Sequence, residues 1–190
     1  GGISANPTAL LQEILPDRNV KTKEMSQKKI MGYEKGERQM RTRRLGKTGL
    51  MVSEIGFGGE WLERHPEEES IELIKYASKK GINILDCWMA DPKSRNIIGE
   101  GIKENRSQWF IQGHIGSTWK DEQYYRTREM EYVRPAFEDL LKRLQTDYID
   151  LGMIHYVDSE EEWENILRSD YMDYVMELKN KGVIRHIGMS

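Results

Sequence analysis

The sequence has 190 residues, of which 37% are hydrophobic and 32% charged, and its formal net charge is −3. This length fits one ordinary soluble domain or part of a larger one, and the near-neutral charge gives no electrostatic case for nucleic acid. No apolar run approaches the roughly 20 residues that a membrane span needs, so we expect no membrane partner. The single cysteine, Cys87, excludes an internal disulfide and fits a reducing compartment. The first residues lack the charged and then apolar layout of a secretory signal. We therefore expect a cytoplasmic protein.

Residues 1–39 differ in composition from the residues that follow. They are rich in Lys, Glu, Gln and Met, and their only apolar cluster lies within Leu10–Leu15. The remainder carries too little apolar surface to offset the entropy lost on ordering. We expect a flexible or non-native extension, with the natural protein beginning at Met40. The alternative is that the Leu10–Leu15 cluster packs on the domain as a short amphipathic helix.

From Met40 onward, β-rich segments alternate with segments of helical periodicity. The glycines of Gly46–Gly49 predict a hairpin between Thr42–Leu45 and Leu50–Val52. The later predicted segments are a strand at Ile55–Gly58, a helix at Glu67–Lys80, a strand at Ile82–Leu85, a helix at about Ser94–Glu104, a strand at Trp109–Ile115, a polar loop at Ser117–Thr127, a helix at Arg128–Leu144, a strand at Tyr148–Ile154, a helical region at about Glu160–Asn180 and a strand at Ile184–Met189. Crossovers of this length predict an α/β fold with a parallel sheet.

Polar or small residues fall at or near the ends of successive predicted strands, namely Gly58, Asp86, His114, His155 and Ser190. Taken singly, a buried histidine is more often a hydrogen-bonded core residue, and an aspartate after a strand is usually a helix N-cap. The carboxyl ends of parallel strands meet at one end of a sheet. We therefore expect Asp86, His114 and His155 to converge there, with the predicted hairpin at the opposite end.

Four segments together resemble the aldo-keto reductase superfamily: LGKTGLMVSEIGFGG, NILD, LLKRLQTDYIDLGMIH and GVIRHIGMS. The resemblance covers Met40 to the end and implies a partial (β/α)8 TIM barrel of about five strands with an N-terminal hairpin, so we expect the chain to be part of a longer protein. It also implies reduction of a small-molecule carbonyl, or oxidation of an alcohol, with NADP or NAD. Ser190 matches the first residue of a Ser-Asn pair that touches the nicotinamide amide, and Gly58 and Asp86 are the other predicted cofactor contacts.

In the family that this chain resembles, a Tyr gives the proton as hydride arrives, Lys and Asp tune that Tyr, and a His orients the carbonyl. The resemblance assigns the Asp to Asp86 and the His to His155. The Tyr position is Asp91 in this sequence, and the Lys position falls at His114. We therefore predict an altered catalytic set of Asp86, Asp91, His114 and His155. His114 would be the replacement acid, oriented by Asp86 or Asp91, because an ordinary histidine pKa of about 6.5 lies near working pH.

Two other interpretations stay open. Asp86, Asp91, His114 and His155 would suit a divalent metal ion, although their spacing matches no metal signature. Alternatively, the barrel binds a ligand without catalysis, which the lost Tyr and Lys favour and the retained Asp86 and His155 oppose. Some members of the family with unusual tetrads carry a C-terminal iron–sulfur domain. Cys87 alone cannot hold a cluster, so a cluster would need residues beyond Ser190.

Overall fold

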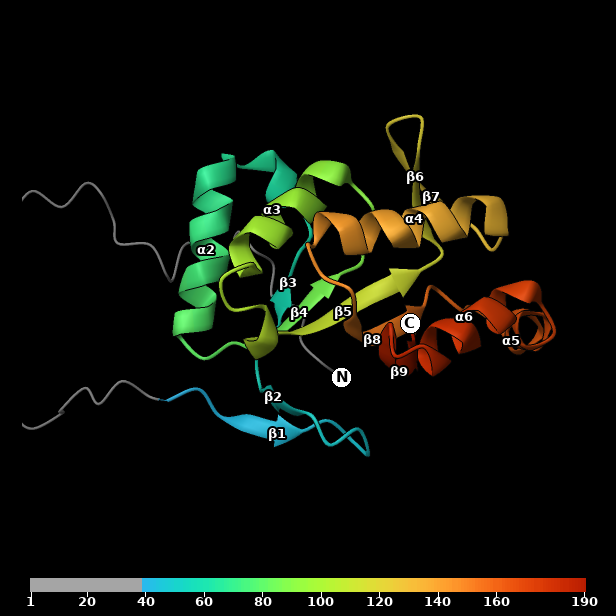
Figure 1. The fold of residues 1–190 in the computed structure, drawn as a ribbon, viewed down its shortest axis with the longest axis horizontal. Helices are drawn as coiled ribbons and strands as arrows, with labels where there is room; N and C mark the ends of the chain where they lie inside the picture. The colour runs from blue at the N-terminus through green and yellow to red at the C-terminus, as the bar shows by residue number, and fades with distance from the viewer. Residues whose placement is uncertain (1–38) are drawn as a thin grey trace, which may run out of the picture.

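The computed structural model describes residues 39–190, and these residues form an α/β fold around a five-stranded sheet (Figure 1). In chain order the strands are β3 Phe57–Gly58, β4 Ile84–Cys87, β5 Phe110–Ile115, β8 Ile149–Ile154 and β9 Ile184–Met189. They lie in the order β3-β4-β5-β8-β9, and each pairing is parallel. Sheet order that follows chain order, with a helix in the crossovers, is the arrangement of a TIM barrel. The predicted parallel sheet is confirmed.

Helices connect the strands and cover the sheet. Their bounds are α2 Glu67–Lys79, α3 Pro92–Ile102, α4 Met130–Arg143, α5 Glu160–Leu167 and α6 Asp170–Asn180, with 3-10 turns η1 Leu62–Arg64 and η2 Arg106–Gln108. Figure 1 shows α2, α3 and α4 side by side on one side of the sheet. The predicted helical region at about Glu160–Asn180 consists of two helices, because Ser159 and Ser169 each cap a new helix. None of the described helices has the length and apolar character to cross a membrane.

The core forms where these helices meet the strands. Its fully buried members include Ile74, Leu85, Ile97, Ile98, Ile111, Leu140, Ile149, Val175 and Ile184. Gly99 of α3 allows that helix to approach the end of α4, since a Cβ at this position would lie 2.0 Å from the carbonyl oxygen of Arg143. Met40 packs against the same core. The prediction for residues 1–39 falls, except for Gln39, outside the described residues.

The predicted N-terminal hairpin is present as β1 Thr42–Arg44 paired antiparallel with β2 Met51–Ser53. Asn83, which immediately precedes β4, binds this hairpin. Its Oδ1 accepts a hydrogen bond from the Ser53 backbone N (2.7 Å), and its Nδ2 donates to the Met51 carbonyl (3.0 Å). The hairpin therefore lies at the amino ends of the strands, as expected.

A second hairpin replaces the polar loop predicted at residues 117–127, and that prediction is wrong. β6 Ser117–Lys120 pairs antiparallel with β7 Gln123–Arg126, and Figure 1 shows this hairpin projecting away from the sheet. Gly116, at φ 97°, turns the chain out of β5. Asp121 and Glu122, at φ 50° and 60°, form the tight turn. Two-residue hairpin turns usually have Asn or Gly at the positions with positive φ, and this turn has neither. The sequence therefore carries no hairpin signal here.

Candidate active site

Three polar side chains converge at the carboxyl end of the sheet. Asp86 lies on β4, His114 on β5, and His155 directly follows β8. His114 Nε2 is 3.0 Å from Asp86 Oδ1, and His114 Nδ1 is 2.9 Å from His155 Nδ1. The convergence expected from the strand ends is therefore confirmed, at the end of the sheet opposite to the N-terminal hairpin.

The alternation of β5 decides which way His114 points. A Cβ at Gly113 would lie 2.8 Å from the side chain of Leu140, so Gly113 faces α4. Successive strand residues face opposite sides, which turns His114 away from the helix layer. His114 and His155 are only 6% and 3% exposed. The structure thus holds two adjacent imidazoles in a nearly dry position.

Burial and positive neighbours make His155 hard to protonate. Burial is the largest cause, followed by His114, Arg128 and Arg126, and together they lower the pKa of His155 to about 3. His155 is therefore neutral at neutral pH. A neutral imidazole donates one hydrogen bond and accepts one, so its two partners must play opposite roles.

The second partner of His155 is Tyr124, from β7. The phenol oxygen of Tyr124 is 2.6 Å from His155 Nε2. Trp88 contacts both groups, stacking on His155 (centroids 6.1 Å apart) and meeting the Tyr124 ring edge-on (5.3 Å). Burial raises the pKa of Tyr124, so the phenol keeps its proton at neutral pH. Tyr124 lies in a segment predicted as a loop, and no sequence motif marks it as a site residue.

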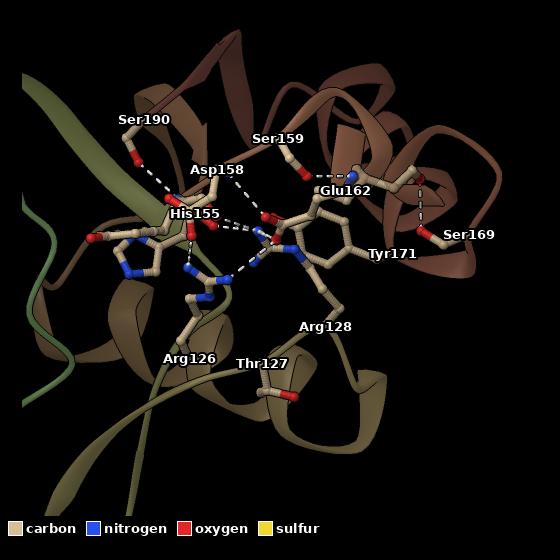
Figure 2. A network of polar contacts seen from close by, with 12 residues as sticks. Arg126, Thr127, Arg128, His155, Asp158, Ser159, Glu162, Ser169, Tyr171 and Ser190 are labelled. Carbon is tan, nitrogen blue, oxygen red and sulfur yellow. Dashed lines mark hydrogen bonds and ion pairs between the residues drawn. The ribbon is translucent and has the colours of Figure 1, made fainter. Parts of the chain in front are cut away.

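Two arginines fix the hairpin to the loop that follows β8 (Figure 2). Arg126 pairs with Asp158 (Nη1 to Oδ2, 2.9 Å). Arg128 Nη2 donates to the backbone carbonyls of His155 and Tyr156 and lies 3.3 Å from Glu162 Oε1. These contacts tie the hairpin to α5 and to His155. The position of Tyr124 beside the imidazole is therefore braced by a charged network.

The remaining predicted site residues lie at different distances from this cluster. Gly58 pairs with Asp86 in the sheet register. Ser190 Oγ accepts a hydrogen bond from the backbone N of Tyr156 (3.0 Å), the residue after His155. Asp91 is engaged elsewhere: its carboxylate accepts from Ser94 N at 2.6 Å and caps α3. The catalytic role of Asp91 stays a prediction, since within residues 39–190 its structural bond is to the helix and not to the histidines.

The chain was compared with known proteins. The model of the Aldo/keto reductase family matches residues 54–190. The chain belongs to this family. Oxidoreductase YqkF of Bacillus subtilis is 34% identical over 155 residues, which cover 80% of this chain and 49% of the relative. Glyoxal reductase of the same organism is 34% identical over 125 residues, covering 64% and 40%.

Solved aldo-keto reductases share the fold. The holo form of aldo-keto reductase AKR11C1 from Bacillus halodurans superposes with a TM-score of 0.68 at 29% identity, covering 80% of this chain and 50% of that one. The chain thus spans about half the length of the relatives it matches. Its five strands form the corresponding part of an aldo-keto reductase barrel, which confirms the predicted partial TIM barrel.

The metal and iron–sulfur interpretations depend on how His, Cys, Asp and Glu side chains are arranged. Within residues 39–190, no group of three or more His, Cys, Asp or Glu side chains is arranged to hold a metal ion. Cys87 is buried, and burial raises its pKa to about 12. A thiol that resists ionisation is a poor cluster ligand, and this sequence has no second cysteine. The residues present do not fit an iron–sulfur cluster.

Proposed function

We propose that the protein containing this chain is a nicotinamide-dependent oxidoreductase, reducing a small-molecule carbonyl or oxidising an alcohol through an altered catalytic set. The observation that carries the proposal is the hydrogen-bonded series Asp86–His114–His155 at the carboxyl end of an aldo-keto reductase sheet. This end of a TIM barrel is where catalytic groups gather.

The residues near this series fit the nicotinamide end of NADP or NAD. The Ser190 hydroxyl lies beside the loop after His155 and can hydrogen-bond a carboxamide, and Gly58 is the sheet partner of Asp86. A bound nicotinamide supplies or accepts the hydride. Support for an aldehyde or ketone substrate comes from family membership and from the likeness to a glyoxal reductase.

His114 is the proton store in this proposal. Both its nitrogens are occupied, one by Asp86 and one by His155, so it has no free nitrogen for a substrate. The Asp86 carboxylate accepts the hydrogen of His114 Nε2. In this proposal the proton leaves His114 through Nδ1, which faces His155. His114 therefore acts on the substrate through His155 and not directly.

The test uses the whole protein with NADPH and NADH, glyoxal and methylglyoxal among a panel of carbonyls, and steady-state rates. His155→Ala and His114→Phe should each lower kcat/KM by about 10²-fold or more, the usual contribution of a positioned proton-transfer group. The control is His65→Gln, on the loop after η1, which should leave the rate unchanged.

Two outcomes would count against the proposal. If the protein binds a nicotinamide cofactor but turns over no carbonyl or alcohol, the non-catalytic barrel is the better interpretation. If it binds neither cofactor, and metal analysis of the purified protein finds a stoichiometric divalent ion that Asp86→Ala removes, the metal interpretation replaces both.

A further inference from the structure

We propose that Tyr124 is the catalytic residue that exchanges a proton with the substrate, and that His155 relays this proton to and from His114, which holds it beside the Asp86 carboxylate. This inference rests on the proposed function. The family resemblance would place the acid at position 91. This proposal places it on the β6–β7 hairpin, which follows β5. The carrying observation is one unbroken series of hydrogen-bonding atoms from the Tyr124 phenol to the Asp86 carboxylate.

The direction of each bond follows from donor and acceptor chemistry when both rings are neutral. An ionised Asp86 only accepts, so His114 Nε2 carries the hydrogen and His114 Nδ1 is an acceptor. His155 Nδ1 must then donate to His114, which leaves His155 Nε2 as an acceptor. The Tyr124 hydroxyl is therefore the donor in the 2.6 Å contact. Every bond in the series points from Tyr124 toward Asp86.

A second contact on His114 fits this description. The Gln112 side-chain nitrogen lies 3.4 Å from His114 Nε2, farther than the Asp86 oxygen at 3.0 Å. Which amide atom faces the ring is an assignment, since oxygen and nitrogen exchange on rotation of the amide. The shorter, charge-assisted contact sets the hydrogen on Nε2.

Adding one proton to the series reverses the two hydrogen bonds that His155 makes, and the phenol hydrogen becomes free. His114 becomes an imidazolium that donates to Asp86 through Nε2 and to His155 through Nδ1. His155 then donates from Nε2 to the Tyr124 oxygen, and the phenol O–H is left to point at a substrate. The loaded series thus presents Tyr124 as an acid, with its charge stored beside the Asp86 carboxylate.

The proton balance closes over the reduction. The carbonyl carbon receives a hydride from the reduced nicotinamide, and its oxygen takes the Tyr124 proton. Tyr124 recovers a proton from His155 Nε2, and His155 Nδ1 recovers one from His114 Nδ1. His114 ends neutral, with its remaining hydrogen on Nε2, where it is donated to Asp86. Alcohol oxidation runs the same transfers backward.

Accessibility matches these roles. Tyr124 is 36% exposed and can reach a substrate, whereas the two histidines are buried. The Asp86 side chain, which faces the stored charge, is 35% exposed. The series is reloaded at the Tyr124 end, where the phenol passes its hydrogen to His155 Nε2 and takes one from water. The charged and titratable groups nearest the Tyr124 end are Arg126, Arg128 and Tyr156. The positive charge of the two arginines disfavours a cation on His155 and so keeps the stored charge on His114.

The experiment compares Tyr124→Phe with Tyr125→Phe. Both variants delete one phenol from the same hairpin, but Tyr125 packs on Tyr132 and has no part in the series. With any carbonyl that the wild type reduces, Tyr124→Phe should lower kcat by about 10²-fold or more. Tyr125→Phe should leave kcat unchanged, and cofactor affinity, measured by fluorescence titration, should be the same in all three proteins.

A second readout needs no cofactor or substrate. Imidazole nitrogen NMR at alkaline pH should show His155 as the Nδ1–H tautomer and His114 as the Nε2–H tautomer. Tyr124→Phe should shift the His155 Nε2 resonance, which loses its donor, and Tyr125→Phe should not.

The results separate this inference from the proposed function. An active wild type whose Tyr124→Phe variant matches Tyr125→Phe in kcat overturns the role of Tyr124 and leaves the oxidoreductase proposal standing. Opposite tautomers in the NMR experiment overturn the relay. A wild type that reduces no carbonyl and binds no nicotinamide overturns the proposed function and this inference with it.

Discussion

His155 shows how a polar side chain can be buried without an unpaired atom. Its Nδ1 faces His114, its Nε2 faces Tyr124, and its backbone carbonyl accepts from Arg128. Each of these hydrogen bonds offsets part of the free energy that is lost when a polar group is removed from water. The neutral ring fits this surrounding, whereas a protonated ring would place a cation in a dry site beside two arginines.

We expect His155 to make the protein sensitive to acid. The pKa of this ring is about 3 in the folded protein, below its ordinary value of 6.5, so the unfolded chain binds the proton more readily between these values. The contribution to stability is full above pH 6.5 or so and declines as pH falls toward 3. Urea midpoints for wild type and His155→Gln, taken at about pH 7.5 and about pH 5, should show a smaller acid loss in the variant. An equal loss in both proteins would contradict the assignment.

Among the elements, β8 carries a buried charge. Asp150 lies within it and is 1% exposed. Its Oδ2 accepts from the Ile111 backbone N (2.9 Å) on β5, and its Oδ1 pairs with Arg185 of β9 (3.1 Å). Arg106 of η2 lies 3.5 Å from the same carboxylate. One buried charge therefore joins β8 to both neighbouring strands.

Removing that carboxylate should weaken the sheet. Asp150→Ala leaves the Ile111 N–H without its acceptor and two arginines without their counter-charge, and we expect a loss of about 3–5 kcal/mol in the free energy of unfolding. The matched control is Glu164→Ala, which breaks an exposed pair with Arg168 and should cost no more than about 1 kcal/mol. Urea denaturation measures both variants, and a similar small loss in each would show that Asp150 is not a structural anchor.

At the scale of the whole molecule, the described sheet ends in two edge strands, β3 and β9. Ile187 and Met189 on β9 are 38% and 55% exposed. An apolar edge strand is a template for pairing with another chain. The chain covers about half the length of the relatives it matches.

The 190-residue chain expressed alone should self-associate through β9. Ile187→Lys should reduce this association, because a charge on an edge strand opposes pairing with a second edge. Met176→Lys, a matched change at an exposed apolar residue of α6, should not reduce it. Light scattering across a concentration series measures the outcome, and association that is equal in wild type and Ile187→Lys would place the contact elsewhere.

Local pattern was enough to predict the parallel sheet, the N-terminal hairpin and the convergence of Asp86, His114 and His155. Strand periodicity and the rule that parallel strands share a carboxyl end depend only on neighbouring residues and chain direction. Tyr124 needed the tertiary structure. It lies on β7, which pairs with β6 across a turn of Asp121 and Glu122 that carries neither glycine nor asparagine, and from there its phenol reaches His155, 31 residues away in the sequence. Asp91, in contrast, caps α3 through the backbone N of Ser94, a contact only three residues away. Contacts between residues distant in sequence depend on how elements pack, and a single sequence carries no direct record of that packing.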